Sequence, residues 1–238
     1  MHNSYIVKVQ QKRRLLIFFS TLIVFGFVIF LNTPNVSISE HEIKGYVTNR
    51  DAKSAIETLN KISIKNKDAK DGYSREMFGN GWATDAGCNT RNIILNRDLT
   101  QVVFNEKCEV MSGILNDPYS GKTISFIRGG DSSSDIQIDH VVALSNAWQT
   151  GAQQLNQNIR ITLANDPLEL LAVDGSINQQ KSDGDAATWL PPNKSFRCQY
   201  VARQIAVKQK YSLWVTTAEH DAMTRVLNTC PEQQLPAA

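Results

Sequence analysis

The spacing of apolar residues changes several times along the chain, and each spacing predicts a different secondary structure. Residues 55–65 carry apolar side chains at helical spacing and predict one short amphipathic helix. Residues 108–115 and 123–127 are strand-like stretches on either side of the sequence NDPYSGK. The Asn-Asp-Pro and Ser-Gly pairs of that sequence favour a turn, so the two stretches predict a β-hairpin.

Two further strands are expected after the hairpin. Residues 136–138 predict a strand that ends at Asp139 and His140, after which the apolar residues return to helical spacing. Residues 168–173 form a short apolar run and predict the second strand. The two strands therefore enclose a helical segment.

The last third of the chain is predicted to be helical. Ser176 is expected to cap a helix that contains Asn178 and Lys181. Residues 196–227 predict two more helices, the second of which begins at Thr217. Strands followed by helices in this order predict the α+β class.

The N-terminal part has the pattern of an export signal. Residues 15–31, LLIFFSTLIVFGFVIFL, are uncharged and directly follow a basic tail, residues 1–14. These 17 residues exceed the core of most cleaved signal peptides and reach the lower limit of a membrane span, so an uncleaved anchor and a cleaved signal both stay open. In both cases the remainder is expected outside the cytoplasmic membrane. It comprises a spacer with the short helix (32–72), the main domain (73–230) and a C-terminal tail (231–238).

Charge is distributed unevenly along the chain. The sequence has 25 Lys and Arg against 23 Asp and Glu, a formal net charge of +2. The four charged residues among the first 31 are all basic, so the remainder has 21 basic and 23 acidic residues, a net charge of −2. A strongly basic nucleic-acid coat protein is therefore excluded, and any polyanion must bind to a local patch.

Residues 186–218 are the candidate for such a patch. They contain five basic residues interleaved with aromatic residues and no acidic residue. The alternative is a helix with a solvated basic face and an aromatic core face. The five basic residues are Lys194, Arg197, Arg203, Lys208 and Lys210.

The four cysteines predict disulfides. They all follow the apolar run and form no Cys-x-x-Cys pair, so a zinc ribbon is not expected. Three pairings are open; we favour Cys88 with Cys108 and Cys198 with Cys230, because each closes a local loop. The first pair would staple residues 73–108, which are rich in Gly, Asn and Asp and are expected to form loops.

The residues with the clearest chemical meaning surround the predicted strands. Asp139 and His140 place a carboxylate beside an imidazole, and Asn178 and Lys181 follow about 40 residues later. A metal-dependent phosphodiesterase uses these residue types as oxygen ligands of the cation, as a base for water and as a partner of phosphate. The Asp-His pair alone is weak evidence, because a histidine satisfied at a strand end has the same pattern.

Several short motifs accompany these residues. They are Phe78-Gly79, Cys88-x-Thr90-Arg91, Asp117-Pro118-Tyr119-x-Gly121, Asp139-His140-Val141-Val142-Ala143-Leu144, Asn165-Asp166-Pro167, Asn178-x-x-Lys181-x-Asp183 and Trp189-Leu190-Pro191. Together with the last two cysteines these motifs resemble the secreted HNH endonuclease family proteins, whose domain also occurs at the C-terminus of GmrSD-type restriction enzymes. The resemblance covers roughly residues 73–230. It implies a ββα-metal (HNH) core with a preceding β-hairpin, flanking helices and disulfides.

The resemblance implies a role for each matching residue. Asp139 and Asn178 would hold one divalent ion, Mg²⁺ or Mn²⁺, and His140 would be the general base that deprotonates the attacking water. Lys181 would contact a phosphate oxygen, although a solvated helix lysine fits the sequence equally well. One position departs from the family pattern, because Glu169 stands where the family has Asn.

This departure bears on activity. A carboxylate accepts hydrogen bonds but does not donate them as an amide does, so Glu169 would either loosen the loop that holds His140 or favour the metal by its charge. Asn165 is a nearby substitute. Arg91 and Arg128 are expected in loops around the site, where they either position phosphate or form structural ion pairs.

The sequence thus predicts an exported metal-dependent endonuclease that hydrolyses phosphodiester bonds of DNA, with RNA as the second candidate. Its predicted partners are the nucleic acid and, through the N-terminal segment, the membrane; no protein partner is predicted. One alternative is a catalytically degenerate surface module that binds nucleic acid or another polyanion. Another is a disulfide-stapled surface domain without a nucleic-acid role.

Overall fold

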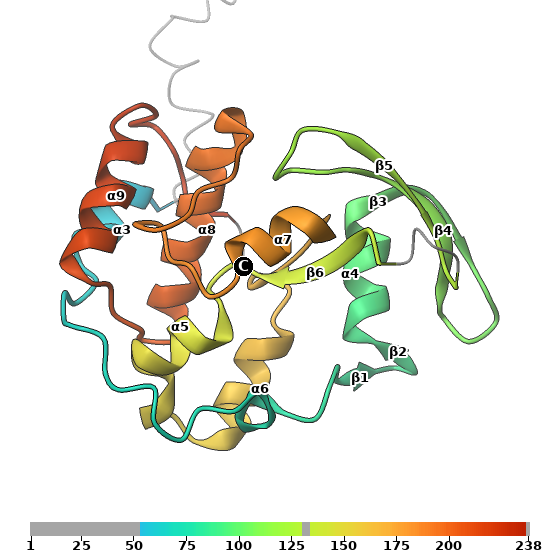
Figure 1. Cartoon of the computed structure of the whole chain (residues 1–238), viewed down its shortest axis with the longest axis horizontal. Coiled ribbons are helices and arrows are strands. Elements are labelled where there is room, and N and C mark those ends of the chain that lie inside the picture. The colour runs from blue at the N-terminus through green and yellow to red at the C-terminus, as the bar shows by residue number, and fades with distance from the viewer. Residues whose placement is uncertain (1–52, 130–133, 237–238) are drawn as a thin grey trace, which may run out of the picture. The chain divides into compact units, whose positions relative to one another are not determined.

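The structure is a computed structural model in which residues 53–129 and 134–236 are described. The predicted export segment, residues 15–31, lies outside the described residues, as does its basic flank. Within the described ranges, no helix has the length and apolar character needed to cross a membrane. The described elements mix helices and strands, as the predicted α+β class requires (Figure 1).

The elements follow one another along the chain as in Figure 1. The strands are β1 (Thr84–Asp85), β2 (Cys88–Asn89), β3 (Leu99–Phe104), β4 (Val110–Asn116), β5 (Thr123–Ile127), β6 (Ile136–His140) and β7 (Leu170–Asp174). The α-helices are α3 (Ala55–Leu59), α4 (Thr90–Asp98), α5 (Leu144–Gln149), α6 (Gln157–Asn165), α7 (Gly175–Lys181), α8 (Arg197–Lys210) and α9 (Thr217–Leu227). Short 3-10 helices are η1 (Arg75–Phe78), η3 (Ala152–Gln154) and η4 (Lys194–Phe196).

The predicted hairpin is confirmed as β4 and β5, and β3 extends it to a three-stranded antiparallel sheet. Asn116 pairs with Thr123 beside the turn. The carbonyl oxygen of Asp117 closes the turn by accepting a hydrogen bond from the backbone nitrogen of Gly121 at 2.8 Å. Gly121 has a φ of 75°, which glycine adopts without strain, and this explains why the turn has a glycine at this position.

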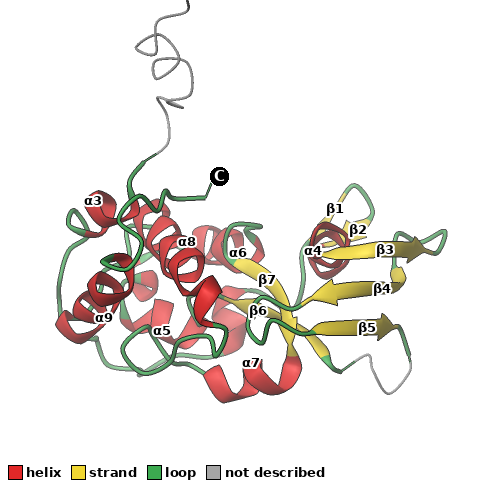
Figure 2. Ribbon diagram, turned by 90° about the horizontal axis from the view of Figure 1, so that it is seen from above, coloured by secondary structure: helices red, strands yellow, loops and turns green. Residues whose placement is uncertain are grey.

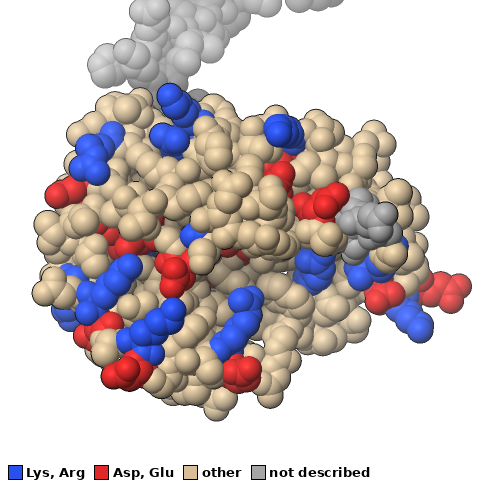
Figure 3. Space-filling view, in the orientation of Figure 1, with Lys and Arg blue, Asp and Glu red and all other residues tan. Residues whose placement is uncertain are grey.

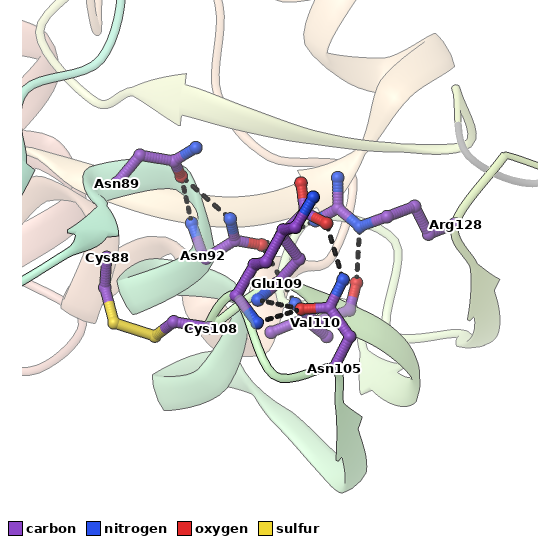
Figure 4. Close-up of a disulfide and its surroundings, with 9 residues drawn as sticks. Cys88, Asn89, Asn92, Asn105, Cys108, Glu109, Val110 and Arg128 are labelled. Carbon is purple, nitrogen blue, oxygen red and sulfur yellow. Dashed lines mark hydrogen bonds between the residues drawn. A yellow bond between two sulfur atoms is a disulfide. The ribbon is translucent and has the colours of Figure 1, made fainter.

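Helix α4 lies in the segment for which loops were expected. Its N-cap is Asn89, whose side-chain oxygen accepts a hydrogen bond from the backbone nitrogen of Asn92 at 2.9 Å. Ile94 is fully buried in a core between α4 and the sheet. The predicted disulfide between Cys88 and Cys108 is confirmed and lies next to this cap (Figure 4).

Helices α3, α8 and α9 form a second core, away from the three-stranded sheet (Figure 2). Ala55 and Leu59 of α3 are fully buried in it. Residues 53–72, which were expected to be part of a spacer, therefore belong to the same compact unit as the rest of the described chain. The second predicted disulfide, between Cys198 and Cys230, is also confirmed and joins α8 to the residues after α9.

The antiparallel pair β6–β7 lies between the two cores. Side chains of β7 alternate between them, because Leu170 and Ala172 pack under α4 while Leu171 and Val173 pack against the helices. A continuous apolar run is typical of a strand that is buried on both faces. Such a strand supplies a rigid base for polar residues at the ends of the pair.

Helix α7 begins directly after β7 and packs against β6. Its N-cap is Asp174, whose Oδ1 accepts hydrogen bonds from the backbone nitrogens of Ser176 and Ile177 at 2.8 and 3.1 Å. The prediction that Ser176 caps this helix was wrong, because the carboxylate at the strand end already reaches the free amides. The result is a strand, strand, helix arrangement that brings α7 next to β6.

Candidate active site

His140 is the last residue of β6, and α6 holds its ring in one tautomer. Nε2 of His140 lies 3.0 Å from the carbonyl oxygen of Ala164, which only accepts hydrogen bonds, so Nε2 carries the proton. The side chain is 7% exposed, and this burial lowers the pKa of His140 to about 3. At neutral pH the imidazole is therefore uncharged and Nδ1 retains its lone pair, as a general base requires.

A cavity of about 310 Å³ opens beside this histidine. The ring of Trp82 stacks on the imidazole in the wall of the cavity, with centroids 5.7 Å apart and planes 7° apart. Arg75 and Glu76, both from η1, add one positive and one negative charge to the lining. The sequence did not identify these three residues as site residues, and the Phe78-Gly79 motif was the signal nearest to them.

The loop that carries Trp82 is fixed to α6 by Asn165. The side-chain oxygen of Asn165 accepts a hydrogen bond from the backbone nitrogen of Ala83 at 2.8 Å. Its amide nitrogen donates to the carbonyl oxygen of Ile161 at 2.9 Å. Asn165 thus positions the wall of the cavity.

Asp139 points towards α7, and protein groups engage both of its carboxylate oxygens. Lys181 Nζ lies 2.8 Å from Oδ1, and the hydroxyl of Tyr119 donates to Oδ2 at 2.5 Å. Burial raises the pKa of Asp139, and the neighbouring ammonium opposes that rise. The hairpin turn, β6 and α7 therefore meet at one buried carboxylate.

Lys181 is buried rather than solvated. Its side chain has 0% exposure, and Nζ donates to the carbonyl oxygen of His140 at 2.7 Å as well as to Asp139. The expectation that Lys181 contacts a phosphate is not met, because the ammonium is enclosed by the protein. Instead Lys181 ties α7 to β6 and fixes the backbone that carries the imidazole.

In this arrangement the predicted divalent ion does not fit its predicted ligands. Asp139 already has an ammonium against one oxygen and a hydroxyl against the other. Asn178, the second predicted ligand, donates its amide to the side-chain oxygen of Gln137 at 2.9 Å. Nowhere in residues 53–129 and 134–236 are three or more His, Cys, Asp or Glu side chains grouped to hold a metal.

Glu169 is fully buried at the start of β7, next to the turn that follows His140. Its Oε2 accepts a hydrogen bond from the backbone nitrogen of Val142 at 3.3 Å, and Oε1 has no hydrogen-bond partner in the described chain. Burial raises the pKa of Glu169 well above its usual range. Burial thus favours the protonated acid over the carboxylate, and in the protonated form the side chain has an O–H donor as an amide has an N–H donor.

The two arginines predicted near the site have structural roles. Arg91 donates to the carbonyl oxygen of Ile136 at 3.1 Å. Arg128 donates to the carbonyl oxygen of Val110 at 2.8 Å and to the side chain of Asn92 at 2.5 Å (Figure 4). Both side chains join neighbouring elements by hydrogen bonds to backbone carbonyls and, for Arg128, also to the Asn92 side chain. Neither arginine forms the alternative ion pair with a described residue.

The basic residues of 186–218 are also mostly engaged within the protein. Arg197 and Arg203 donate to carbonyl oxygens 2.8 and 2.7 Å away, while Lys208 and Lys210 form ion pairs of 3.0 and 2.6 Å. Lys194 is exposed and forms no hydrogen bond or ion pair through its side chain with the described residues. On the face drawn in Figure 3, Lys and Arg are interspersed with Asp and Glu and do not form one patch. The structure therefore favours the aromatic core with engaged basic side chains.

Comparisons with known proteins add two findings. Residues 89–226 match the family described as GmrSD restriction endonucleases, C-terminal domain. An uncharacterized secreted protein of Arthroderma benhamiae is 41% identical over 182 residues, which cover 75% of this chain and 86% of that protein. The family match includes His140 and Glu169 and begins after η1 and the Trp82 loop.

Proposed function

Because the chain belongs to the GmrSD restriction endonuclease C-terminal domain family, we propose that it is a nuclease that hydrolyses phosphodiester bonds, with DNA as the first candidate substrate and RNA as the second. The observation that supports this proposal most directly is the state of His140. Its imidazole is neutral, is fixed at Nε2 and lines a cavity. A general base must be unprotonated and held in position, and His140 meets both conditions.

The chemical step assigned to His140 is proton abstraction. Nδ1 accepts a proton from a water molecule, and the water oxygen forms a bond to phosphorus as the bond to the leaving oxygen breaks. The leaving oxygen takes a proton from solvent. The ammonium of Lys181 holds the His140 carbonyl at 2.7 Å, and Ala164 holds Nε2, so the ring is oriented before the substrate binds.

The test is cleavage of plasmid DNA and of single-stranded RNA by the purified protein and by its His140→Gln variant. We expect the variant to lose at least roughly 100-fold in rate, as general bases contribute roughly 10² to 10⁴. His220→Gln is the matched control, because His220 lies on α9 and does not line the cavity. An unchanged rate in His140→Gln would contradict the assignment.

The same assay addresses the metal. Binding of one Mg²⁺ or Mn²⁺ ion stays a prediction from the family resemblance. It does not fit the present contacts of Asp139, because Lys181 and Tyr119 already contact the two carboxylate oxygens. Cleavage is therefore measured with Mg²⁺, with Mn²⁺ and with EDTA. If EDTA abolishes activity, a metal ion must bind in one of two ways. Either Asp139 gives up its contact with Lys181 or Tyr119 and binds the ion, or a different set of residues supplies the ligands.

A second candidate function is binding of nucleic acid without cleavage. It is supported by Glu169, which is buried with one oxygen unpartnered where the family has Asn. This candidate expects salt-sensitive binding and no turnover, because contacts to phosphates dominate such binding. It also expects Glu169→Asn to restore cleavage if that residue is the cause.

We also propose that the described domain is extracellular. The two disulfides persist in an oxidising compartment, and the relative from Arthroderma benhamiae is a secreted protein. Detection of the protein in the medium or on intact cells tests this. N-terminal sequencing of the exported protein then distinguishes a cleaved signal from an anchor.

A further inference from the structure

We propose that Arg75 is the phosphate-binding residue of the cavity and holds the scissile phosphodiester beside His140. This inference rests on the proposed function, because it assigns a substrate contact for that same site. The group recognised is a phosphodiester of a nucleic acid, which a guanidinium binds through two parallel hydrogen bonds.

The position of Arg75 fits a contact with phosphate. Arg75 begins η1, its side chain is exposed, and it lines the same cavity as His140 and Trp82. An anion bound to its guanidinium would therefore lie in the cavity that the imidazole also lines.

The guanidinium of Arg75 forms no hydrogen bond or ion pair with the described residues. Six other arginines of the described chain donate hydrogen bonds to protein oxygens, whereas Arg75 and Arg225 form none there. Of these two, Arg75 alone lines the cavity, and Arg225 lies on α9. The six engaged residues are Arg91, Arg97, Arg128, Arg160, Arg197 and Arg203.

The backbone that carries Arg75 is held in place by packing and hydrogen bonding. Phe78 of η1 is 2% exposed, and Arg160 Nε donates to the carbonyl oxygen of Met77 at 2.9 Å. The guanidinium of Arg160 also lies 5.5 Å from the centre of the Trp148 ring. An exposed side chain on a fixed base can close on a ligand with little backbone reorganisation.

Among the residues that line the cavity, Arg75 is the cation available to contact a phosphate. Glu76 is the acidic residue of the lining, and Arg75 is the basic one. Trp82 covers one face of the imidazole, and its own ring offers an apolar surface to a sugar or base. A phosphate that approaches His140 therefore meets Arg75 as its positive partner in this cavity.

The test compares Arg75→Ala and Arg75→Lys with Arg225→Ala, which removes the other free guanidinium. In single-turnover cleavage we expect about a 10²-fold loss for Arg75→Ala, the magnitude seen when one donor to a developing charge is removed. Arg75→Lys is expected to retain part of the rate, because it keeps the charge without the bidentate geometry. Arg225→Ala should match the wild type.

Binding is measured separately so that the two proposals can fail separately. A fluorescein-labelled single-stranded oligonucleotide is titrated in EDTA at several salt concentrations, with all proteins checked for folding by circular dichroism. Arg75→Ala should weaken binding at least 10-fold and lower the slope of log affinity against log salt by roughly 0.7, the value for one phosphate contact on a single strand.

The outcomes distinguish the phosphate contact of Arg75 from the nuclease function. Arg75-dependent binding without any cleavage supports the phosphate site and contradicts the nuclease function. Cleavage and binding that are both unchanged in Arg75→Ala overturn the inference and leave the nuclease function standing. Absence of both cleavage and binding in the wild type overturns both proposals.

Discussion

Replacing Lys181 by methionine tests the buried contact that holds β6 and α7 together. The substitution keeps most of the apolar stem and removes an ammonium that is fully buried, 2.8 Å from Asp139 and 2.7 Å from the carbonyl oxygen of His140. The carboxylate would then be left buried with only the hydroxyl of Tyr119 as a side-chain donor. We expect a loss of about 3 to 5 kcal/mol in the free energy of unfolding, as for other buried pairs that lose one partner.

Urea unfolding followed by tryptophan fluorescence measures this loss. With an m-value of about 2 kcal/mol/M, the midpoint should fall by about 2 M. The double variant Lys181→Met/Asp139→Asn should recover much of the loss, because no uncompensated charge remains. Lys70→Met is the control, since its 3.2 Å pair with Asp183 has side chains 53% and 54% exposed and should contribute at most about 1 kcal/mol. Equal effects of Lys181→Met and Lys70→Met would refute the reasoning.

Three further predictions concern stability. Burial raises the pKa of Glu169, so the stability from its neutral form is present below about pH 4.5 and is lost as the pH rises through the raised pKa. Glu169→Gln should therefore gain unfolding free energy relative to the wild type as the pH increases above about 4.5, and parallel curves of unfolding free energy against pH would contradict this. Burial lowers the pKa of His140 to about 3, so the stability contributed by the neutral imidazole is present above about pH 6.5 and is lost on acidification. Relative to His140→Gln, the free energy of unfolding of the wild type should fall by about 3 kcal/mol by pH 4. Replacing Cys198 and Cys230 by serine opens a loop of 32 residues and should lower the unfolding free energy by about 4 kcal/mol, which urea titration would detect.

Local patterns predicted those elements that local chemistry determines. The turn residues around Asp117 predicted the hairpin, and the helical spacing of apolar residues predicted α8 and α9. Helix α4 was missed because its sequence is rich in Asn and Arg and has few apolar residues. It is stabilised by the cap at Asn89 and by burial of Ile94 against strands distant in the sequence, and neither contribution produces a helical pattern.

The candidate site was predictable in its residue types and not in its contacts. The sequence singled out Asp139 and Lys181, but their pairing joins positions 42 residues apart, and the burial that makes it possible comes from packing. A basic residue on a helix has the same local signal whether it is solvated or enclosed. Arg75 and Trp82 lay in a segment with loop-like composition, so only the fold places them beside His140.

The claim that His140 is the base of a phosphodiester hydrolase can be tested by one measurement. It is the single-turnover cleavage rate of a labelled DNA duplex at saturating protein, compared between the wild type and His140→Gln at pH 7. Saturation removes differences in binding, so the rate reports the chemical step. We expect cleavage by the wild type and a rate at least roughly 100-fold lower in the variant. Equal rates, or no cleavage by the wild type, would contradict it.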